Sequence, residues 1–481
     1  MNDRETDVTV VGSGPNGLAA AVTAARAGLA VRLVEAAPTL GGGMRTTEST
    51  LPGFRHDVCS AVHPAAFASP FFRSIGLFDR LDWITPELSY AHPLARGAGL
   101  AWRDLDRTVD GLGRDGGAWR RLVEPLVRRI DGVVDVTGHQ LLRWPHDPIA
   151  ALRLGVRAFE QGTGLWNARF RDEVAPALFT GVVAHAAGRM PGFTSAGVGL
   201  LLAAHGHAGG WGYPVGGSQA IADALVADLV EHGGAVETDA LVTSLAELAD
   251  RSPSRVTLLD TSPELLRTAP LPPRYLRSLD RYRYGSGVAK VDFAVAGPVP
   301  WANPEVGLAP TVHLGGSRAE IAAAENLVAT GRMPEHPYVL LTQPGVLDPS
   351  RAPGAAQTVW AYLHVPAGST LHATELVTAA IERFAPGFRD SVLASASTSA
   401  AELAAYNPNY PGGDIYSGAI TLSQLVRRPV VSTAPWRTPL PGVYLCSSAT
   451  PPGPAVHGMN GWFAARLALR ERFGIEVPEI A

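Results

Sequence analysis

The sequence predicts an α/β protein in which three separated segments form one parallel-sheet domain and the intervening chain forms a second, mixed α+β domain. Three observations support this prediction. A strand, glycine turn, helix and strand open the chain, a glycine-rich turn with an amphipathic helix lies near its middle, and a strand with another glycine-rich helix start lies near its end. At 481 residues, the chain is long enough for two large domains.

Composition excludes several classes of protein. Hydrophobic residues make up 46% and charged residues 17% of the chain, which excludes disorder over most of it. The net charge of −4, without a polybasic block, excludes nucleic acid as an expected partner. Two cysteines are too few for a disulfide framework, and no Cys/His cluster predicts a metal site. No apolar run reaches the about 20 residues of a spanning helix, and the polar N-terminus favours a cytoplasmic protein.

The first unit predicts a dinucleotide site. A β-branched strand at 7–11 leads into Gly12-Ser13-Gly14-Pro15-Asn16-Gly17, and an alanine-rich helix at 18–27 is followed by a strand that ends at Glu35. Gly12 permits the tight turn, Gly14 lets the backbone approach a pyrophosphate, and Gly17 lets helix and strand pack closely. The helix N-terminus then faces the phosphates. Glu35 is placed to accept hydrogen bonds from ribose hydroxyls, and it disfavours the 2′-phosphate of NADP.

A second glycine cluster distinguishes between cofactors. Gly41-Gly42-Gly43-Met44-Arg45-Thr46 follows six residues after Glu35, and NAD domains do not require such a cluster. Here the sequence resembles the flavin amine oxidase and phytoene desaturase superfamily. The resemblance implies FAD as the cofactor, with the glycines close to the dinucleotide and Arg45 near its phosphates. Glycine permits such an approach, and arginine binds phosphate in a bidentate manner.

The tail predicts the other end of the same site. A strand at 441–446 and a loop precede Val456-His457-Gly458-Met459-Asn460-Gly461, which opens a helix at 462–473. Such a helix start binds anions and suits the electron-rich N1–O2 edge of a reduced flavin. The resemblance implies that the backbone of Gly458 and Met459 lies near the isoalloxazine ring.

A middle segment belongs to the same predicted domain. Ser218 is a candidate N-cap for a helix with Ile221, Leu225, Leu229 and Val230 on one face, and a strand at 235–242 follows. The resemblance implies that Val242 covers the adenine and that the chain around Cys59 passes under the isoalloxazine. The expected FAD contacts are Gly12, Gly14, Pro15, Asn16, Gly17, Glu35, Ala36, Gly42, Gly43, Met44, Arg45, Val58, Cys59, Ser60, Ala61, Val242, Thr450, Gly458 and Met459.

The resemblance extends over nearly the whole chain. Phrases such as 53–57, 406–410 and 413–415 resemble bacterial phytoene-desaturase-like proteins related to the pyridine nucleotide-disulfide oxidoreductase domain 2 group. The expected fold is a Rossmann-like FAD-binding domain with a discontinuous mixed α+β substrate domain. The FAD-binding domain is expected at 1–75, 205–265 and 430–481. The substrate domain is expected at 76–204 and 266–429. Its first part is expected to be helical and its second part to carry strands at 288–295, 338–343 and 358–364. The apolar residues at helical spacing are Trp119, Leu122, Leu126, Val127, Ile130 and Val134.

Two residues are candidates for catalysis. Lys290 lies in a segment that resembles the amine-oxidase strand whose lysine points at flavin N5, although the spacing differs by one residue. A strand lysine that only reaches solvent is the alternative. His457, one residue before Gly458, is a candidate proton carrier, and a helix-cap histidine bonded to backbone is the alternative.

The resemblance implies an FAD-dependent oxidoreductase that transfers hydride from a C–H bond of a largely apolar organic substrate to flavin N5. Oxygen, a quinone or another acceptor would reoxidise the flavin. A flavin-dependent saturase or isomerase, and a flavoprotein with structural FAD that binds a partner, are the alternatives. Peripheral membrane contact stays open, although no exposed apolar segment is evident from the sequence. Monomer and homodimer both stay open.

Overall fold

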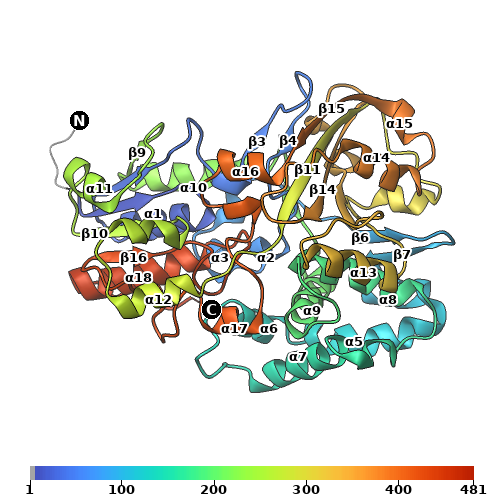
Figure 1. The fold of residues 1–481 in the computed structure, drawn as a ribbon, viewed down its shortest axis with the longest axis horizontal. Helices are drawn as coiled ribbons and strands as arrows, with labels where there is room; N and C mark the ends of the chain where they lie inside the picture. The colour runs from blue at the N-terminus through green and yellow to red at the C-terminus, as the bar shows by residue number, and fades with distance from the viewer. Residues whose placement is uncertain (1–5, 481) are drawn as a thin grey trace.

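The computed structural model describes residues 6–480 and contains two large sheets (Figure 1). One is a five-stranded parallel sheet in the order β16-β10-β1-β2-β9. Its strands are β1 (Val8–Val11), β2 (Val31–Val34), β9 (Ala235–Glu237), β10 (Val256–Leu259) and β16 (Val443–Leu445). Segments far apart in the sequence supply one sheet, because parallel strands are joined by crossovers and not by hairpins. The predicted α/β fold with a Rossmann-like domain is confirmed.

Three helices cover this sheet: α1 (Pro15–Arg26), α10 (Gln219–Glu231) and α18 (Met459–Phe473). Their apolar side chains share one core with the strands, in which Leu18, Leu33 and Leu225 are fully buried. Helix α1 begins at Pro15, three residues before the predicted start, because proline is favoured in a first turn that needs no N–H from it. Helix α18 likewise begins three residues before the predicted 462.

The second sheet has seven strands in the order β15-β11-β14-β13-β12-β6-β7, antiparallel except between β12 and β6. Its strands are β6 (Leu88–Pro93), β7 (Ala98–Trp102), β11 (Gly287–Val295), β12 (Thr311–Leu314), β13 (Val339–Thr342), β14 (Gln357–Val365) and β15 (Val392–Thr398). The register of β11 with β14 runs from Gly287 opposite Val365 to Val295 opposite Gln357. The three strands predicted here are therefore confirmed.

Helices pack beside the second sheet and form the lower part of the molecule in Figure 1. In α5, Trp119, Leu122 and Leu126 are fully buried, as their helical spacing predicts. The helix ends at Val127, so Ile130 and Val134 lie on the next helix, and these three side chains are only partly buried. These helices are α4 (Leu105–Gly111), α5 (Gly116–Val127), α6 (Ile130–Thr137), α7 (Pro148–Gln161), α8 (Val174–Val183), α9 (Phe193–Ala208), α13 (Arg318–Val328) and α17 (Leu422–Val426). The other helices are α2 (Pro64–Phe67), α3 (Pro70–Ser74), α11 (Leu245–Arg251), α12 (Pro273–Asp280), α14 (Thr374–Glu382), α15 (Phe388–Ser391) and α16 (Ala400–Tyr406).

Two details differ from the sequence prediction. The strand predicted at 235–242 ends at Glu237, because Asp239 takes a positive φ of 54° and the N–H of Ala240 bonds back to the carbonyl of Glu35. Val230 is 55% exposed, because it lies about 100° around the helix from the buried Leu229.

No helix within residues 6–480 is long and apolar enough to cross a membrane. The domain boundaries stay a prediction.

Candidate flavin and substrate site

The carboxyl ends of three adjacent parallel strands meet at one edge of the five-stranded sheet. Gly12 follows the central strand β1, Glu35 follows β2, and Asp260 follows β10. In open parallel sheets, ligands bind outside this edge. The sheet therefore brings the predicted glycine turn, the predicted acid and a second acid to one place.

The glycine turn has no room for side chains. Gly12 has a φ of 94°, and a Cβ on Gly17 would lie 2.0 Å from the carbonyl oxygen of Gly12. Gly14 is the N-cap of α1 and supplies no side chain to cap it, and Pro15 follows. Gly14 therefore offers no side-chain cap to the start of α1, and the carboxylate of Asp260 accepts the N–H of Gly17 in this first turn. The positive dipole end of α1 favours negative charge, and in this structure Asp260 lies there.

Glu35 and Arg45 hold the two glycine segments together. One carboxylate oxygen of Glu35 accepts hydrogen bonds from the N–H and the hydroxyl of Ser13, at 2.9 and 2.5 Å. The other oxygen accepts from Arg45 at 3.1 Å. Arg45 also donates to the carbonyl of Thr39 and to the hydroxyl of Tyr406. Because each of its three nitrogens already donates to a protein acceptor here, contact of Arg45 with phosphate stays a prediction, as does contact of Glu35 with ribose.

The starts of α1 and α18 touch, which brings the two ends of the chain together. A Cβ on Gly461 would lie 1.8 Å from the carbonyl oxygen of Asn16. The Oδ1 atoms of Asn16 and Asn460, each in the first turn of its helix, are buried without a hydrogen-bond donor. Buried acceptors normally have a donor, and the ribityl hydroxyls of FAD would supply such donors. The residues present therefore fit FAD.

Other predicted contacts surround these helix starts. The N–H of Val58 bonds to the carbonyl of Arg45, and the N–H of Ser60 bonds to Gly43 of the 3₁₀ turn η1 (Gly42–Met44). Burial raises the pKa of Cys59 to about 11, so its thiol stays protonated. Thr450 is buried and its carbonyl accepts from Asn460. Ala36 is exposed beside Glu35, and Val242 packs near Val11.

A pocket of about 640 Å³ joins the helix starts to the helices of the second sheet. Of the predicted residues, those that line it are Pro15, Gly43, Met44, Cys59, Ser60, Ala61, His457 and Met459. Those outside its lining are Gly12, Gly14, Asn16, Gly17, Glu35, Ala36, Gly42, Arg45, Val58, Val242, Lys290, Thr450 and Gly458. Its other walls include residues of α6, α7 and α9, of β13 and β14, and of the segment 415–425, and the sequence did not place those three helices there.

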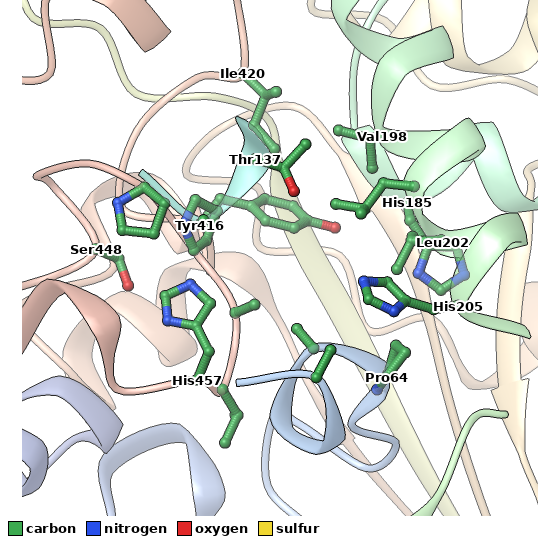
Figure 2. Close-up of a pocket in the computed structure, with 18 of the residues that line it drawn as sticks. Pro64, Thr137, His185, Val198, Leu202, His205, Tyr416, Ile420, Ser448 and His457 are labelled. Atoms are coloured by element: carbon green, nitrogen blue, oxygen red, sulfur yellow. The ribbon is translucent and has the colours of Figure 1, made fainter. Parts of the chain in front are cut away.

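The pocket wall is electrically neutral. Among residues 6–480, no Asp, Glu, Lys or Arg side chain lines it. Its five histidines are His63, His139, His185, His205 and His457. Burial lowers the pKa of His185 to about 3 and of the other four to about 4, so all five are uncharged at neutral pH. Figure 2 shows Tyr416 between His457 on one side and His185 and His205 on the other.

His457 is bonded to backbone at the helix start, as in the second alternative, and its role as a proton carrier stays a prediction. It lines the pocket, and its Nδ1 accepts the N–H of Met459 at 3.1 Å in the first turn of α18. A backbone N–H can only donate, so the neutral ring carries its proton on Nε2. His457 is therefore placed to donate a hydrogen bond from Nε2.

Lys290 does not reach the pocket lining. Its Nζ donates to Asp292 Oδ2 at 2.7 Å, and it lies 5.8 Å from the ring centroid of Trp360, which lines the pocket. The carboxylate two residues along the same face of β11 holds the ammonium group. A catalytic role for Lys290 stays a prediction.

Two buried carboxylates, Asp260 and Asp414, organise this site. Asp260 Oδ2 accepts the N–H of Gly17 at 2.8 Å, and burial raises its pKa to about 7, with a smaller contribution from Glu35. Asp414 accepts N–H groups of Gly285, Tyr416 and Gly418 and so fixes the loop that carries Tyr416. An acid directly after the apolar run 256–259 was the available signal for Asp260.

Comparisons with known proteins agree with this geometry. Residues 7–59 match the family model described as FAD dependent oxidoreductase. The mouse pyridine nucleotide-disulfide oxidoreductase domain-containing protein 2 is 27% identical, and the match covers 97% of this chain and 94% of the relative.

Solved structures share the fold. A structure of putrescine oxidase bound to putrescine superposes with a TM-score of 0.57 at 18% identity, covering 98% of both chains. Cyclohexylamine oxidase from Brevibacterium oxydans has a TM-score of 0.54 at 13% identity, covering 97% of this chain and 99% of that one. The family-model match at the glycine turn, together with the similarity to relatives over nearly the whole chain, supports an oxidoreductase that uses FAD.

Proposed function

We propose that this protein removes hydride from a C–H bond of an uncharged, largely apolar organic molecule held in the pocket. Bound FAD supplies the hydride acceptor, N5, and oxygen, a quinone or another acceptor reoxidises it. The observation that carries the substrate class is the neutral pocket wall, which has no ionised side chain at neutral pH.

An amine in its ammonium form fits this pocket poorly. Putrescine, which is bound in one of the similar structures, carries two ammonium groups at neutral pH. Burying an ammonium ion without a carboxylate partner costs several kcal/mol (about 3 or more). Since no carboxylate lines the pocket within residues 6–480, the favoured substrates lack a formal charge.

The polar groups of the pocket would orient such a substrate. His457 offers one hydrogen-bond donor at Nε2, and the hydroxyls of Tyr362 and Tyr416, which lie 3.5 Å apart, offer a second polar point. The apolar side chains between them exclude water. Together they would hold a carbonyl or hydroxyl oxygen of the substrate and fix the orientation of its C–H bonds.

Anaerobic mixing tests this proposal. The purified holoenzyme is mixed without oxygen with a panel of uncharged unsaturated alcohols, ketones and hydrocarbons, and with putrescine as the charged comparison. We expect at least one uncharged compound to bleach the oxidised-flavin absorbance and putrescine to leave it unchanged. Bleaching by putrescine alone would overturn the substrate class.

Two further arms distinguish the alternatives. A flavoprotein with structural FAD would not be bleached by any compound, whereas a saturase would show reoxidation of chemically reduced flavin by an unsaturated compound. Peroxide release in air, compared with reduction of an artificial quinone, identifies the acceptor. The cytoplasmic location expected from the sequence stays a prediction that fractionation of the host's cells would check.

The role of His457 predicts a particular pH profile. A neutral donor with a pKa of about 4 predicts a turnover rate that is flat from pH 6 to pH 9 and falls only as the ring gains a proton in more acidic solution. His457→Gln keeps an N–H donor, whereas His457→Leu removes it, so Gln should retain more kcat than Leu. A kcat that falls as pH drops through about 6.5 would show that His457 acts as a base instead.

A further inference from the structure

Helix α7 carries an apolar stripe that faces away from the protein. Ile149, Leu152, Val156 and Phe159 recur at helical spacing and are 49% to 66% exposed. Trp144, in the loop before the helix, is 81% exposed. We call these five residues, with the neighbouring Leu141 and Leu142, the α7 face. Monomeric proteins rarely leave so continuous an apolar patch in water, and such patches mark interaction surfaces.

The pocket opens beside the α7 face. Ala151, Leu154 and Ala158 of the same helix line the pocket, on the side of α7 away from the stripe. The lining residues that are themselves exposed are all apolar: Leu141, Phe193, Leu422 and Ala455. Apolar surface thus continues from the outside of α7 through Leu141 into the pocket.

The charges around this helix leave a positive excess. Its two flanking acids are neutralised, since Asp147 pairs with Arg129 at 2.7 Å and Glu160 pairs with Arg169. Within residues 6–480, four arginines on α7 or close in sequence to pocket-lining residues have no carboxylate within 4.0 Å: Arg153 and Arg157 on α7, Arg189 before α9 and Arg427 after α17. Among the acids beside α7, the exposed Asp131 on α6 likewise has no basic partner within that distance. Unpaired arginines beside an apolar face with an exposed tryptophan fit the interface of an anionic lipid bilayer.

We propose that the α7 face docks this protein on a bilayer that contains anionic lipid, so that the pocket opens towards the acyl chains. A second copy seated on the α7 face would cover the pocket opening, whereas fluid lipid leaves a route into it. The docking does not depend on the identity of the substrate, and it needs no turnover.

Flotation with lipid vesicles tests the proposal. The holoenzyme is floated with vesicles of phosphatidylcholine alone and of phosphatidylcholine with phosphatidylglycerol. We expect flotation with the mixed vesicles and an at least about tenfold loss of bound protein in the double variant Leu152→Asp with Phe159→Asp, which places two charges in the apolar layer. The matched control is Leu393→Asp, because Leu393 is 54% exposed and belongs to β15, which lies at the top of the view in Figure 1, whereas α7 lies at the bottom. Equal FAD content in all three proteins shows that they are folded.

Two more measurements refine the result. Brominated acyl chains should quench tryptophan fluorescence in the wild type and less in Trp144→Phe, which locates the α7 face in the lipid. Arg153→Gln should reduce binding to the anionic vesicles more than binding to neutral ones. The proposal is overturned if the wild type does not float with either vesicle or if the double variant floats equally well. It is also overturned if the double variant only dissociates a dimer, since the α7 face would then be an interface between copies.

Discussion

A Cβ atom added to a glycine would clash with backbone in the glycine segments at the sheet edge, but it would meet open space in the helical walls of the pocket. At Gly17 a Cβ would meet backbone at 2.0 Å, and at Gly461 it would meet backbone at 1.8 Å. At Gly155 on α7 and Gly197 on α9, both of which line the pocket, no atom lies within 4 Å of the added Cβ. Backbone packing leaves no tolerance in the first region, whereas the second is a surface whose shape can change without loss of the fold. The difference predicts that the glycine turn requires particular residue types, while the pocket wall tolerates changes in side-chain volume.

The largest expected effect is loss of FAD from Gly17→Ala. The added methyl group must push the carbonyl of Gly12 away, which opens the turn at the start of α1. We expect purified protein with little bound FAD, measured by the ratio of flavin to protein absorbance. Gly111→Ala at the end of α4, where the new Cβ meets nothing within 4 Å, is the control and should keep its FAD. Full FAD content in Gly17→Ala would show that the glycine turn tolerates an added side chain as well as the pocket wall does.

The second largest expected effect is a loss of stability in acid, caused by the buried histidines of the pocket wall. Burial lowers the pKa of His205 to about 4 and that of His185 to about 3, whereas an unfolded histidine has a pKa of about 6.5. The unfolded chain therefore binds more protons below pH 6.5, so the free energy of unfolding falls as pH falls from about 6.5 to about 4. Each such histidine contributes up to about 3 kcal/mol. Thermal unfolding across this range should show the fall, and His205→Gln should reduce its slope.

Asp260 should make the free energy of unfolding depend on pH with the opposite sign. Its pKa is raised to about 7 in the fold, so the folded chain holds the proton more tightly and the carboxyl's contribution to stability declines as pH rises from about 4 to about 7. Ionised Asp260 next to Gly17 would also repel the diphosphate of FAD. If FAD binding raises this pKa by one further unit, affinity falls by about tenfold as pH rises through 7.

Asp260→Asn tests this sign directly. Asn keeps an acceptor for the N–H of Gly17 but cannot ionise, so its affinity for FAD should stay level between pH 6 and pH 8. Fluorescence titration of apoprotein with FAD measures both proteins. An equal pH dependence in the variant would assign the effect to another group.

The smallest expected effect is a gain from Gly197→Ala. Alanine stabilises a helix interior by about 0.5–1 kcal/mol relative to glycine, and the new Cβ has open space in the pocket. We expect a slightly higher Tm, unchanged FAD content and altered selectivity for substrate size. A lower Tm would show that the pocket wall is as tightly packed as the glycine turn.

The sequence by itself determined the parallel-sheet domain and its cofactor end. Gly12, Gly17 and Glu35 could be recognised because a dinucleotide turn requires these residue types at fixed spacing, and the strand β1 and helix α1 that surround them are local structures. The contact between the starts of α1 and α18 could be expected only through resemblance, since Asn16 and Gly461 are far apart in the chain.

Only the tertiary structure decided the pocket, the partner of Lys290 and the α7 face. The sequence could not predict the hydrogen bond from Lys290 to Asp292, because two side chains on one face of a strand can contact a ligand or each other. The apolar positions of α7 look alike in sequence, yet Leu154 lines the pocket and Leu152 faces outwards. Hydrophobic burial is not directional, so the identity of an apolar side chain does not predict what it will contact. Only the long-range packing decides which apolar residues of α7 form the pocket wall and which are exposed.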